Sequence, residues 1–201
     1  MAPHAALEEI GRPFEIRKVE RNEDGLSPPD YLAVNPLGRV PALVDDDGLV
    51  LWESAAITIH LADRHPQAEL LPPPGTAERA IPVRWLVYLT NTVQASFMHF
   101  AYPERLVGGD AVDAVRAGAA RYLAREFEHV DAQLGRGPYL LGETFSAADL
   151  YLHMVTRWCR RLERKAWSLP NVGPHYRLLS ERPSVRRMLD AHGIVAYPDD
   201  Y

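Results

Sequence analysis

The sequence predicts an α/β fold in which a small mixed domain is followed by an all-helical domain. Residues 40–52 form two apolar runs separated by a polar tetrad ending in glycine, which is typical of a β-hairpin. The proline-rich residues 72–75 interrupt regular structure, and every later segment shows apolar residues at helical spacing. We therefore expect a mixed domain over residues 1–71, a linker over 72–75 and a helical domain over 76–201.

Four short segments precede the hairpin. Residues 3–10 predict a helix with proline in its first turn and glycine as its stop, and with its acidic pair Glu8-Glu9 facing water. Residues 14–19 alternate like a β-strand. A polar loop over 21–30 and a short helix over 31–34 complete this part of the mixed domain.

The hairpin carries the most informative residues of the chain. The predicted strands are 40–44 and 49–52, after a turn that contains Gly38. Pro41 has no N–H to donate to a neighbouring strand, so it belongs at a sheet edge or in a cis turn. A cis Val40-Pro41 bond would leave the Val40 backbone free to pair with an extended peptide.

The next helix begins at Glu53-Ser54 and suits a carboxylate. Its first N–H groups have no partner within the helix, and its dipole is positive at this end. Together with the hairpin edge, these residues predict a site for a short anionic peptide. The alternatives are an ordinary turn, an ordinary edge strand and a helix cap.

The segment NPLGRVPAL followed by LWESAAITIHLAD resembles the N-terminal domain of the glutathione transferase family. The resemblance extends from His4 to about Leu189, and it implies a thioredoxin-like first domain and glutathione as co-substrate. It also implies that Val40 and Pro41 hold the cysteinyl backbone of glutathione, and that Glu53 and Ser54 hold its γ-glutamyl end.

The chain opens directly on a helix, although a βαβ unit begins with a strand. The resemblance implies about ten further residues upstream, a strand and a turn in length. In the family they supply the first strand and the Ser, Cys or Tyr that activates the glutathione thiol. We expect a start upstream of Met1, so the catalytic residue is unknown. Alternatively, the remaining strands close up or another segment fills the gap.

A long helix over residues 76–100 opens the helical domain. Val87, Asn91, Gln94 and Met98 follow one another at spacings of four, three and four residues. These four side chains therefore share one face of the helix. Because the family's equivalent helix flanks the glutathione cleft, Asn91 and Gln94 are expected to reach the substrate. Ordinary contacts with solvent or other helices are the alternative for both. The predicted acceptor-substrate cleft comprises Asn91, Gln94, Met98, His99 and Tyr102.

The remaining helices have clear boundary signals. Residues 111–134 carry one apolar stripe, and Ser146 with Asp149 fits a capping box at the start of the next helix. Two further helices begin near 169–171 and 182–184. The polar tail, residues 197–201, is expected to lie over the surface.

Composition excludes several classes of function. The formal net charge of -5 and the absence of a clustered basic surface argue against binding to nucleic acid. No apolar stretch has the length of a membrane span, and the first residues lack the pattern of a signal peptide. The single cysteine, Cys159, excludes an internal disulfide and fits the cytoplasm. Burial is expected for Cys159, and His153 has no neighbour at metal-ligand spacing, so no metal site is predicted.

The resemblance implies an enzyme that conjugates the glutathione thiol to a small electrophile and pairs as a homodimer. Two rival functions stay open. One is a non-catalytic member of the fold that binds glutathione or a protein. The other is a glutathione-dependent isomerase or disulfide reductase, although a reductase would need a cysteine near the first helix, where this chain has none.

Overall fold

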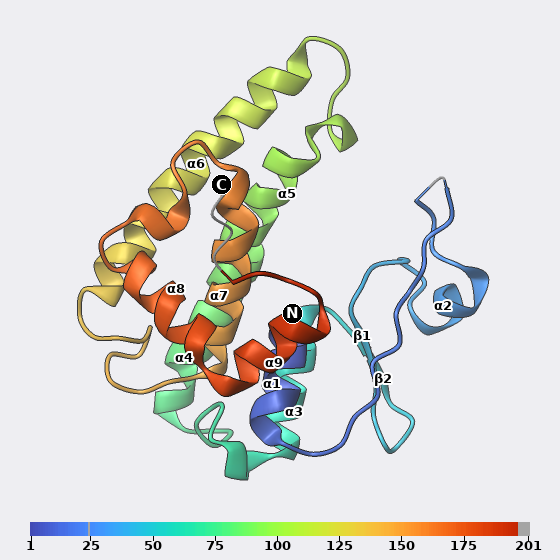
Figure 1. Cartoon of the computed structure of the whole chain (residues 1–201), viewed down its shortest axis with the longest axis vertical. Helices are drawn as coiled ribbons and strands as arrows, with labels where there is room; N and C mark the ends of the chain where they lie inside the picture. Colours follow the sequence, from blue (N-terminus) through green and yellow to red (C-terminus); the bar gives the residue numbers. More distant parts are fainter. Residues whose placement is uncertain (24, 197–201) are drawn as a thin grey trace.

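The computed structural model describes residues 1–23 and 25–196, so the predicted tail over 197–201 lies outside the described residues. Helices α1 (Ala2–Ile10) and α3 (Ser54–Arg64) lie side by side beneath the helical domain, and α2 (Pro29–Val34) lies beyond the hairpin at the edge of the molecule (Figure 1). The predicted helices at 3–10 and 31–34 are confirmed, each beginning one or two residues earlier than predicted, and so is the helix start at Glu53-Ser54.

The hairpin consists of β1 (Ala42–Val44) and β2 (Val50–Trp52), which pair antiparallel. Leu43 pairs with Leu51, and both pack against the core, whereas their neighbours Val44 and Val50 are exposed. One face of the hairpin therefore rests on the helices. Both strands begin later than predicted, and β1 starts directly after the Val40-Pro41 bond.

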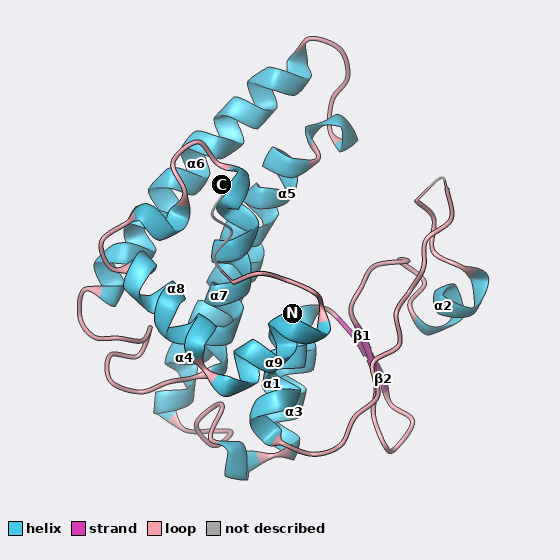
Figure 2. Ribbon diagram, in the orientation of Figure 1, coloured by secondary structure: helices cyan, strands magenta, loops and turns pink. Residues whose placement is uncertain are grey.

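The predicted strand over residues 14–19 is wrong, because the structure describes this segment as extended loop (Figure 2). A strand needs a neighbour to accept and donate its ladder hydrogen bonds. Among the described residues the sheet contains only β1 and β2, so the alternating side chains of 14–19 have no strand beside them. Ile16 is 47% exposed as a result.

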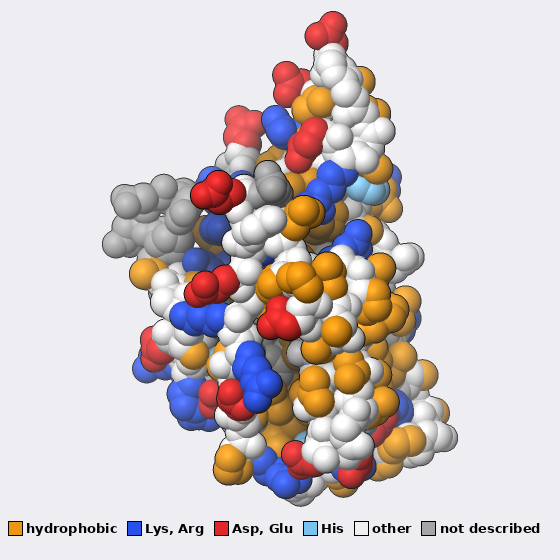
Figure 3. Space-filling view, turned by 90° about the vertical axis from the view of Figure 1, so that its right-hand side faces the viewer, with side chains coloured by type: hydrophobic (Ala, Val, Ile, Leu, Met, Phe, Trp, Pro, Cys, Tyr) orange, Lys and Arg blue, Asp and Glu red, His pale blue; other side chains and the backbone are white. Residues whose placement is uncertain are grey.

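Hydrophobic side chains gather on the side of the molecule that carries the hairpin and α2 (Figure 3). This apolar hairpin face is made of Leu32, Leu37, Val40, Val44, Val50 and Trp52, each at least 40% exposed. Scattered exposed apolar residues are normal, but several from one small region mark a surface suited to a partner.

The predicted long helix over 76–100 is confirmed in extent but is not uniform. It consists of α4 (Ala77–Tyr88), a π-helical turn (Leu89–Gln94) and α5 (Ala95–Ala101). The π-helical turn shifts the faces of the residues that follow it, since each of its turns holds more residues than an α-helical turn. α6 (Ala111–Leu134) packs along α5, and the pair forms the tall part of the molecule (Figure 1).

Helix α7 (Ala147–Trp158) is the centre of the helical domain. Every residue from Ala147 to Arg157 is buried, and α7 contacts α1, α3, α4 and α8. α8 (Val172–Glu181) and α9 (Pro183–Ala191) complete the domain. Short 3₁₀ turns connect the helices at Pro66–Ala68, Pro103–Arg105, Cys159–Arg161 and Ala166–Ser168.

The capping box that starts α7 is confirmed. The Ser146 hydroxyl accepts from the backbone N–H of Ala148, and the Asp149 carboxylate accepts from the backbone N–H of Ser146 at 2.8 Å. We expect Ser146→Ala to lower the free energy of unfolding by about 1 kcal/mol, measured by urea denaturation.

The matched control is Thr76→Ala at the N-cap of α4. Thr76 makes no side-chain cap bond, and its hydroxyl donates instead to the Pro73 carbonyl. This variant should lose clearly less stability than Ser146→Ala. Equal losses in the two variants would show that the capping box does not stabilise α7.

Acidic side chains of α1 bind residues at the start of α9 and within it. The Glu9 carboxylate accepts from Arg182 and Ser184, and Glu8 accepts from Arg187. The predicted exposure of Glu8 and Glu9 is therefore wrong, because arginines from the last two helical segments cover both side chains. These hydrogen bonds hold the pKa of Glu9 below its usual value, against the opposing effect of burial.

Candidate functional site

The turn before the hairpin is held by the buried side chain of Asn35. Its Oδ1 accepts from the Leu37 N–H at 3.1 Å, and its Nδ2 donates to the Arg39 carbonyl at 2.6 Å. The Tyr31 hydroxyl donates to the same carbonyl at 2.6 Å. The turn also requires a positive φ of 61° at Gly38, which glycine adopts without strain. The backbone entering Val40 is thus fixed by side chains of α2 and its C-cap.

The Val40-Pro41 peptide bond is cis, one of the two alternatives that the sequence leaves open for Pro41, and the Val40 side chain is 58% exposed. Register brings this bond close to the start of α3. Since Ala42 pairs with Trp52, the residues one step further along each strand, Pro41 and Glu53, lie at the same end of the hairpin. Three of the four predicted glutathione-binding residues meet at this end, and Ser54 follows Glu53 directly.

Glu53 has an uncommon backbone conformation for a residue with a side chain, with φ at 73°. Its carbonyl accepts from the Ile57 N–H at 3.0 Å, so Glu53 caps α3 through its backbone. The N–H groups of the first α3 turn, beginning at Ser54, have no partner within the helix. A residue held at positive φ costs free energy, and such positions cluster at functional sites.

Polar contacts fix the far end of the hairpin to α3. His60 Nε2 lies 2.6 Å from Asp45 Oδ2, and Arg64 donates to Asp47 at 2.8 Å. The hydrogen bond with His60 holds the pKa of Asp45 below its usual value. The hairpin and α3 are therefore joined at both ends.

The five residues of the predicted acceptor cleft have different surroundings in the structure. Gln94 is half-buried and accepts a hydrogen bond from Tyr151 of α7. Met98 packs against the core, whereas Asn91 is exposed. The Arg105 guanidinium lies over the Tyr102 ring, 4.2 Å from the centroid of that ring. Gln94 therefore makes a contact between helices.

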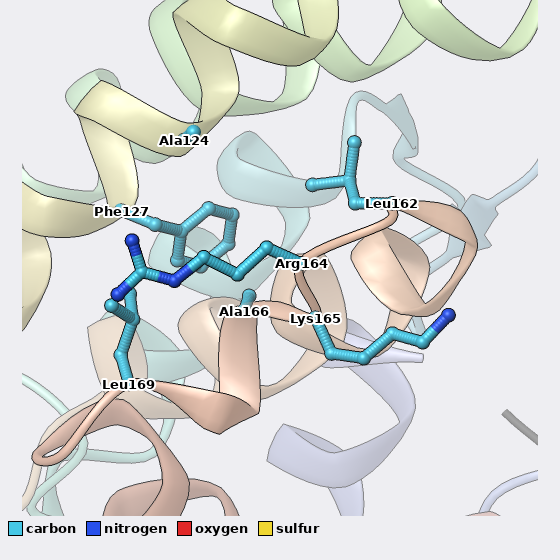
Figure 4. A pocket seen from close by; sticks show the side chains of 7 residues that line it. All are labelled: Ala124, Phe127, Leu162, Arg164, Lys165, Ala166 and Leu169. Atoms are coloured by element: carbon cyan, nitrogen blue, oxygen red, sulfur yellow. The ribbon is translucent and has the colours of Figure 1, made fainter.

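His99, the fifth residue, faces α6. It lines a hollow of about 390 Å³ together with Ser96 of α5 and Val115, Gly118, Ala119 and Tyr122 of α6. A second cavity lies where α6 meets the segment after α7 (Figure 4). Its volume of about 10 Å³ holds at most one water molecule, so it is no substrate site.

Tyr151 is the residue of this region that the sequence analysis missed. Its side chain is fully buried, and burial raises the pKa of its hydroxyl to about 12. A hydrogen bond with Thr90 opposes this rise in the pKa, and the charge of Glu53 adds to it. Its position on a buried helix face made it look like an ordinary core residue.

The other candidate reactive groups lie away from the hairpin. Cys159 is fully buried, as predicted, although it begins a 3₁₀ turn after α7, and burial raises the pKa of its thiol. His153 is buried too. Within residues 1–23 and 25–196, no three His, Cys, Asp or Glu side chains are arranged to hold a metal ion. In the same part of the chain, every helix is too short or too polar to cross a bilayer.

Two family models match the chain. The model described as glutathione S-transferase, N-terminal domain, matches residues 2–64, and the model described as glutathione S-transferase, C-terminal domain, matches residues 113–191. Glutathione S-transferase GstA of Escherichia coli O157:H7 is 31% identical over 198 residues, which cover 96% of this chain and 94% of the relative.

Solved structures agree with these matches. A glutathione transferase from Methylococcus capsulatus is 34% identical, with a TM-score of 0.82 over 96% of this chain and 94% of the other. A sphingomonad glutathione S-transferase complexed with glutathione is 31% identical, with a TM-score of 0.83 and the same two coverages. The chain belongs to the glutathione S-transferase family, with a thioredoxin-like N-terminal domain and a helical C-terminal domain.

Proposed function

We propose that this chain is a glutathione transferase that binds glutathione at the end of the hairpin where β1 begins and β2 ends. The observation that carries the proposal is the position of the Val40-Pro41 segment, with Val40 exposed, at the same end of the hairpin as the Glu53-Ser54 start of α3. A structural relative with 31% identity is complexed with glutathione, which supports the same ligand here.

The cysteinyl and γ-glutamyl residues of glutathione each have a partner of suitable chemistry in this chain. The exposed backbone beside Pro41 suits the cysteinyl residue, because an extended peptide adds to a free strand edge through main-chain hydrogen bonds. The α-carboxylate of the γ-glutamyl residue suits the unpaired N–H groups and hydroxyl of Ser54. The Glu53 carboxylate suits the γ-glutamyl ammonium group as an ion pair.

The proposed reaction is a transfer of the glutathionyl group. The thiol loses its proton, the sulfur forms a bond with an electrophilic carbon, and the leaving group departs with the bonding electron pair. The chain's own cysteine does not supply the reacting sulfur, since Cys159 is buried in the helical domain. This argues against a disulfide reductase that uses a cysteine of this chain.

The proposal includes the further assignments made from the sequence. We place the electrophile beside α5, with Asn91, Gln94, Met98, His99 and Tyr102 as candidate contacts, and we divide the domains at the 72–75 linker. A homodimer is supported by the apolar hairpin face, which offers a surface for a second copy. The single cysteine supports a reducing, cytoplasmic setting and a role in detoxification of electrophiles there.

A calorimetric titration with reduced glutathione tests the binding site. We expect saturable binding by the chain, weakened at least about tenfold in the double variant Glu53→Ala, Ser54→Ala, because an ion pair and a charge-assisted hydrogen bond are lost.

Glu69→Ala is the matched control. Glu69 is an exposed glutamate with a positive φ of 51°, as Glu53 has. Glu69→Ala therefore makes the same Glu-to-Ala exchange in a similar backbone conformation, outside the proposed site. Its affinity for glutathione should equal that of the unmodified chain. A folded chain that does not bind glutathione would refute the proposed function.

A further inference from the structure

Helices α1 and α9 lie side by side and are joined by polar side chains at three points along their length (Figure 1). The Glu9 carboxylate accepts from Arg182, directly before α9, and Glu8 accepts from Arg187 within α9. The third point is a pair of histidines at the far end of α9. The contacts move back along α1 as they move forward along α9, so the two helices run antiparallel.

The histidine pair consists of His4 and His192, whose Nδ1 and Nε2 atoms lie 3.1 Å apart. His4 belongs to α1 and is buried, and the Phe14 ring lies edge-on against it with centroids 5.3 Å apart. His192 is the C-cap of α9 and is exposed. Solvent therefore reaches one ring of the pair directly, and the other ring lies in the contact between the helices.

The hydrogen bond between the two rings tolerates only one positive charge. A neutral imidazole has one nitrogen that donates and one that accepts, whereas a charged imidazole has two donors. With one ring charged, the other ring still offers an acceptor. With both rings charged, the two facing nitrogens each carry a hydrogen, and like charges stand at hydrogen-bond distance. The second proton to bind therefore breaks this contact.

The charged groups around the pair favour the singly charged state, with the charge on His4. Glu8 Oε1 lies 3.4 Å from His4 Nε2. Burial lowers the pKa of His4, and the Glu8 carboxylate opposes that shift, whereas the Met1 amino group adds to it. Burial also lowers the pKa of His192, and the charges of Met1, His4 and Lys18 lower it further. Within residues 1–23 and 25–196, no charged group of α3 or α7 acts on either ring.

The contact at the start of α9 keeps its charges under mild acid. Burial raises the pKa of Glu9, but its hydrogen bonds to Arg182 and Ser184 outweigh burial and hold that pKa below its usual value. Arginine stays protonated throughout. Mild acidification therefore changes the charge at the far end of α9 and leaves the near end joined to α1.

We propose that His4 and His192 form a pH-sensitive fastening: when both rings are protonated, the C-terminal end of α9 separates from α1, while the start of α9 stays attached through Glu9. The released half of α9 carries Met188 and Leu189, which are buried in the folded protein. Acid thus loosens the packing between the N-terminal domain and the last helix. This inference does not depend on the proposed glutathione site.

Hydrogen exchange measured by mass spectrometry at about pH 7.5 and about pH 5 tests the inference, after correction for intrinsic exchange rates. On acidification, we expect the protection of residues 188–194 to fall about tenfold more than that of α7, because local release of the α9 end exposes them. α7 is the internal reference, since it contains His153 and reports any global loss of stability.

Two variants each remove one titrating ring. His192→Gln keeps an acceptor oxygen for the His4 ring but cannot take up a proton, so the acid-dependent loss of protection should disappear. His4→Gln should give the same result. The matched control is His65→Gln, which makes the same exchange at the C-cap of α3 and should keep the loss seen in the unmodified chain.

Thermal melts identify variants that fail to fold. An equal loss of protection in folded His192→Gln would overturn the inference, and so would the absence of a loss in the unmodified chain. Either result would leave the proposed function standing, because neither histidine belongs to the proposed glutathione site.

Discussion

Asp149→Ala should lower the free energy of unfolding by about 3 to 5 kcal/mol, measured by urea denaturation. The carboxylate is fully buried and accepts from the backbone N–H groups of Leu140 and Ser146, at 2.9 and 2.8 Å. His175 Nε2 lies 3.1 Å away, and because a carboxylate only accepts, this nitrogen carries the proton. The Ser146 hydroxyl donates to the same carboxylate at 3.2 Å, so the substitution leaves four buried donors without this acceptor.

Two variants bracket this effect. Asp149→Asn keeps an acceptor oxygen and should lose less stability than Asp149→Ala. Asp190→Ala removes an exposed aspartate of α9 and should change stability by less than about 0.5 kcal/mol. If Asp149→Ala matched Asp190→Ala, the carboxylate would not be a structural centre of the helical domain.

Acidification should destabilise the protein through His153. Its ring is buried, stacks on Tyr176 with centroids 4.7 Å apart, and lies 3.0 Å from the Ser180 hydroxyl. Burial, with smaller effects of the charges on His175 and Arg157, lowers the pKa of His153 to about 3 from its ordinary value of 6.5. Between these two pH values the unfolded chain binds a proton that the folded chain does not.

The free energy of unfolding therefore decreases as the pH falls. The stability contributed by neutral His153 is complete above pH 6.5 and is lost as the pH falls toward 3. From pH 7 to pH 5 this site should cost about 2 kcal/mol, measured by urea denaturation at each pH. His153→Phe keeps a ring against Tyr176 but cannot titrate, so its stability should fall less steeply. Parallel pH profiles for the two proteins would contradict this role of His153.

The parts of the fold that the sequence predicted correctly are those set by neighbouring residues. Proline geometry and a nearby glycine specify the hairpin edge at Pro41, and Ser146 with Asp149 specifies the start of α7 within four residues. The strand over 14–19 failed because pairing depends on a neighbour elsewhere in the chain. Alternation within a segment does not show whether that neighbour is present.

In the candidate site, too, features set by neighbouring residues were predictable and features set by distant residues were not. The residues at the hairpin end are close in sequence, so Pro41 and Glu53 could be placed together from the predicted turn. Gln94 is held by a residue 57 positions away, and the π-helical turn that orients it has no local signature in the sequence. The partners of Glu9 are 173 and 175 positions distant, which explains why its burial could not be foreseen.

The contact between α1 and α9 constrains the order in which the protein is assembled during translation. α1 precedes Arg182, Ser184 and Arg187 in the chain, so it is made before these residues, which bind its acidic side chains. At ordinary rates of synthesis, α1 therefore waits on the order of ten seconds or more for these partners. During that interval the alanines of α1 that are buried in the folded protein are not yet covered by α9. The N-terminal domain reaches its final packing only after the ribosome has finished the helical domain.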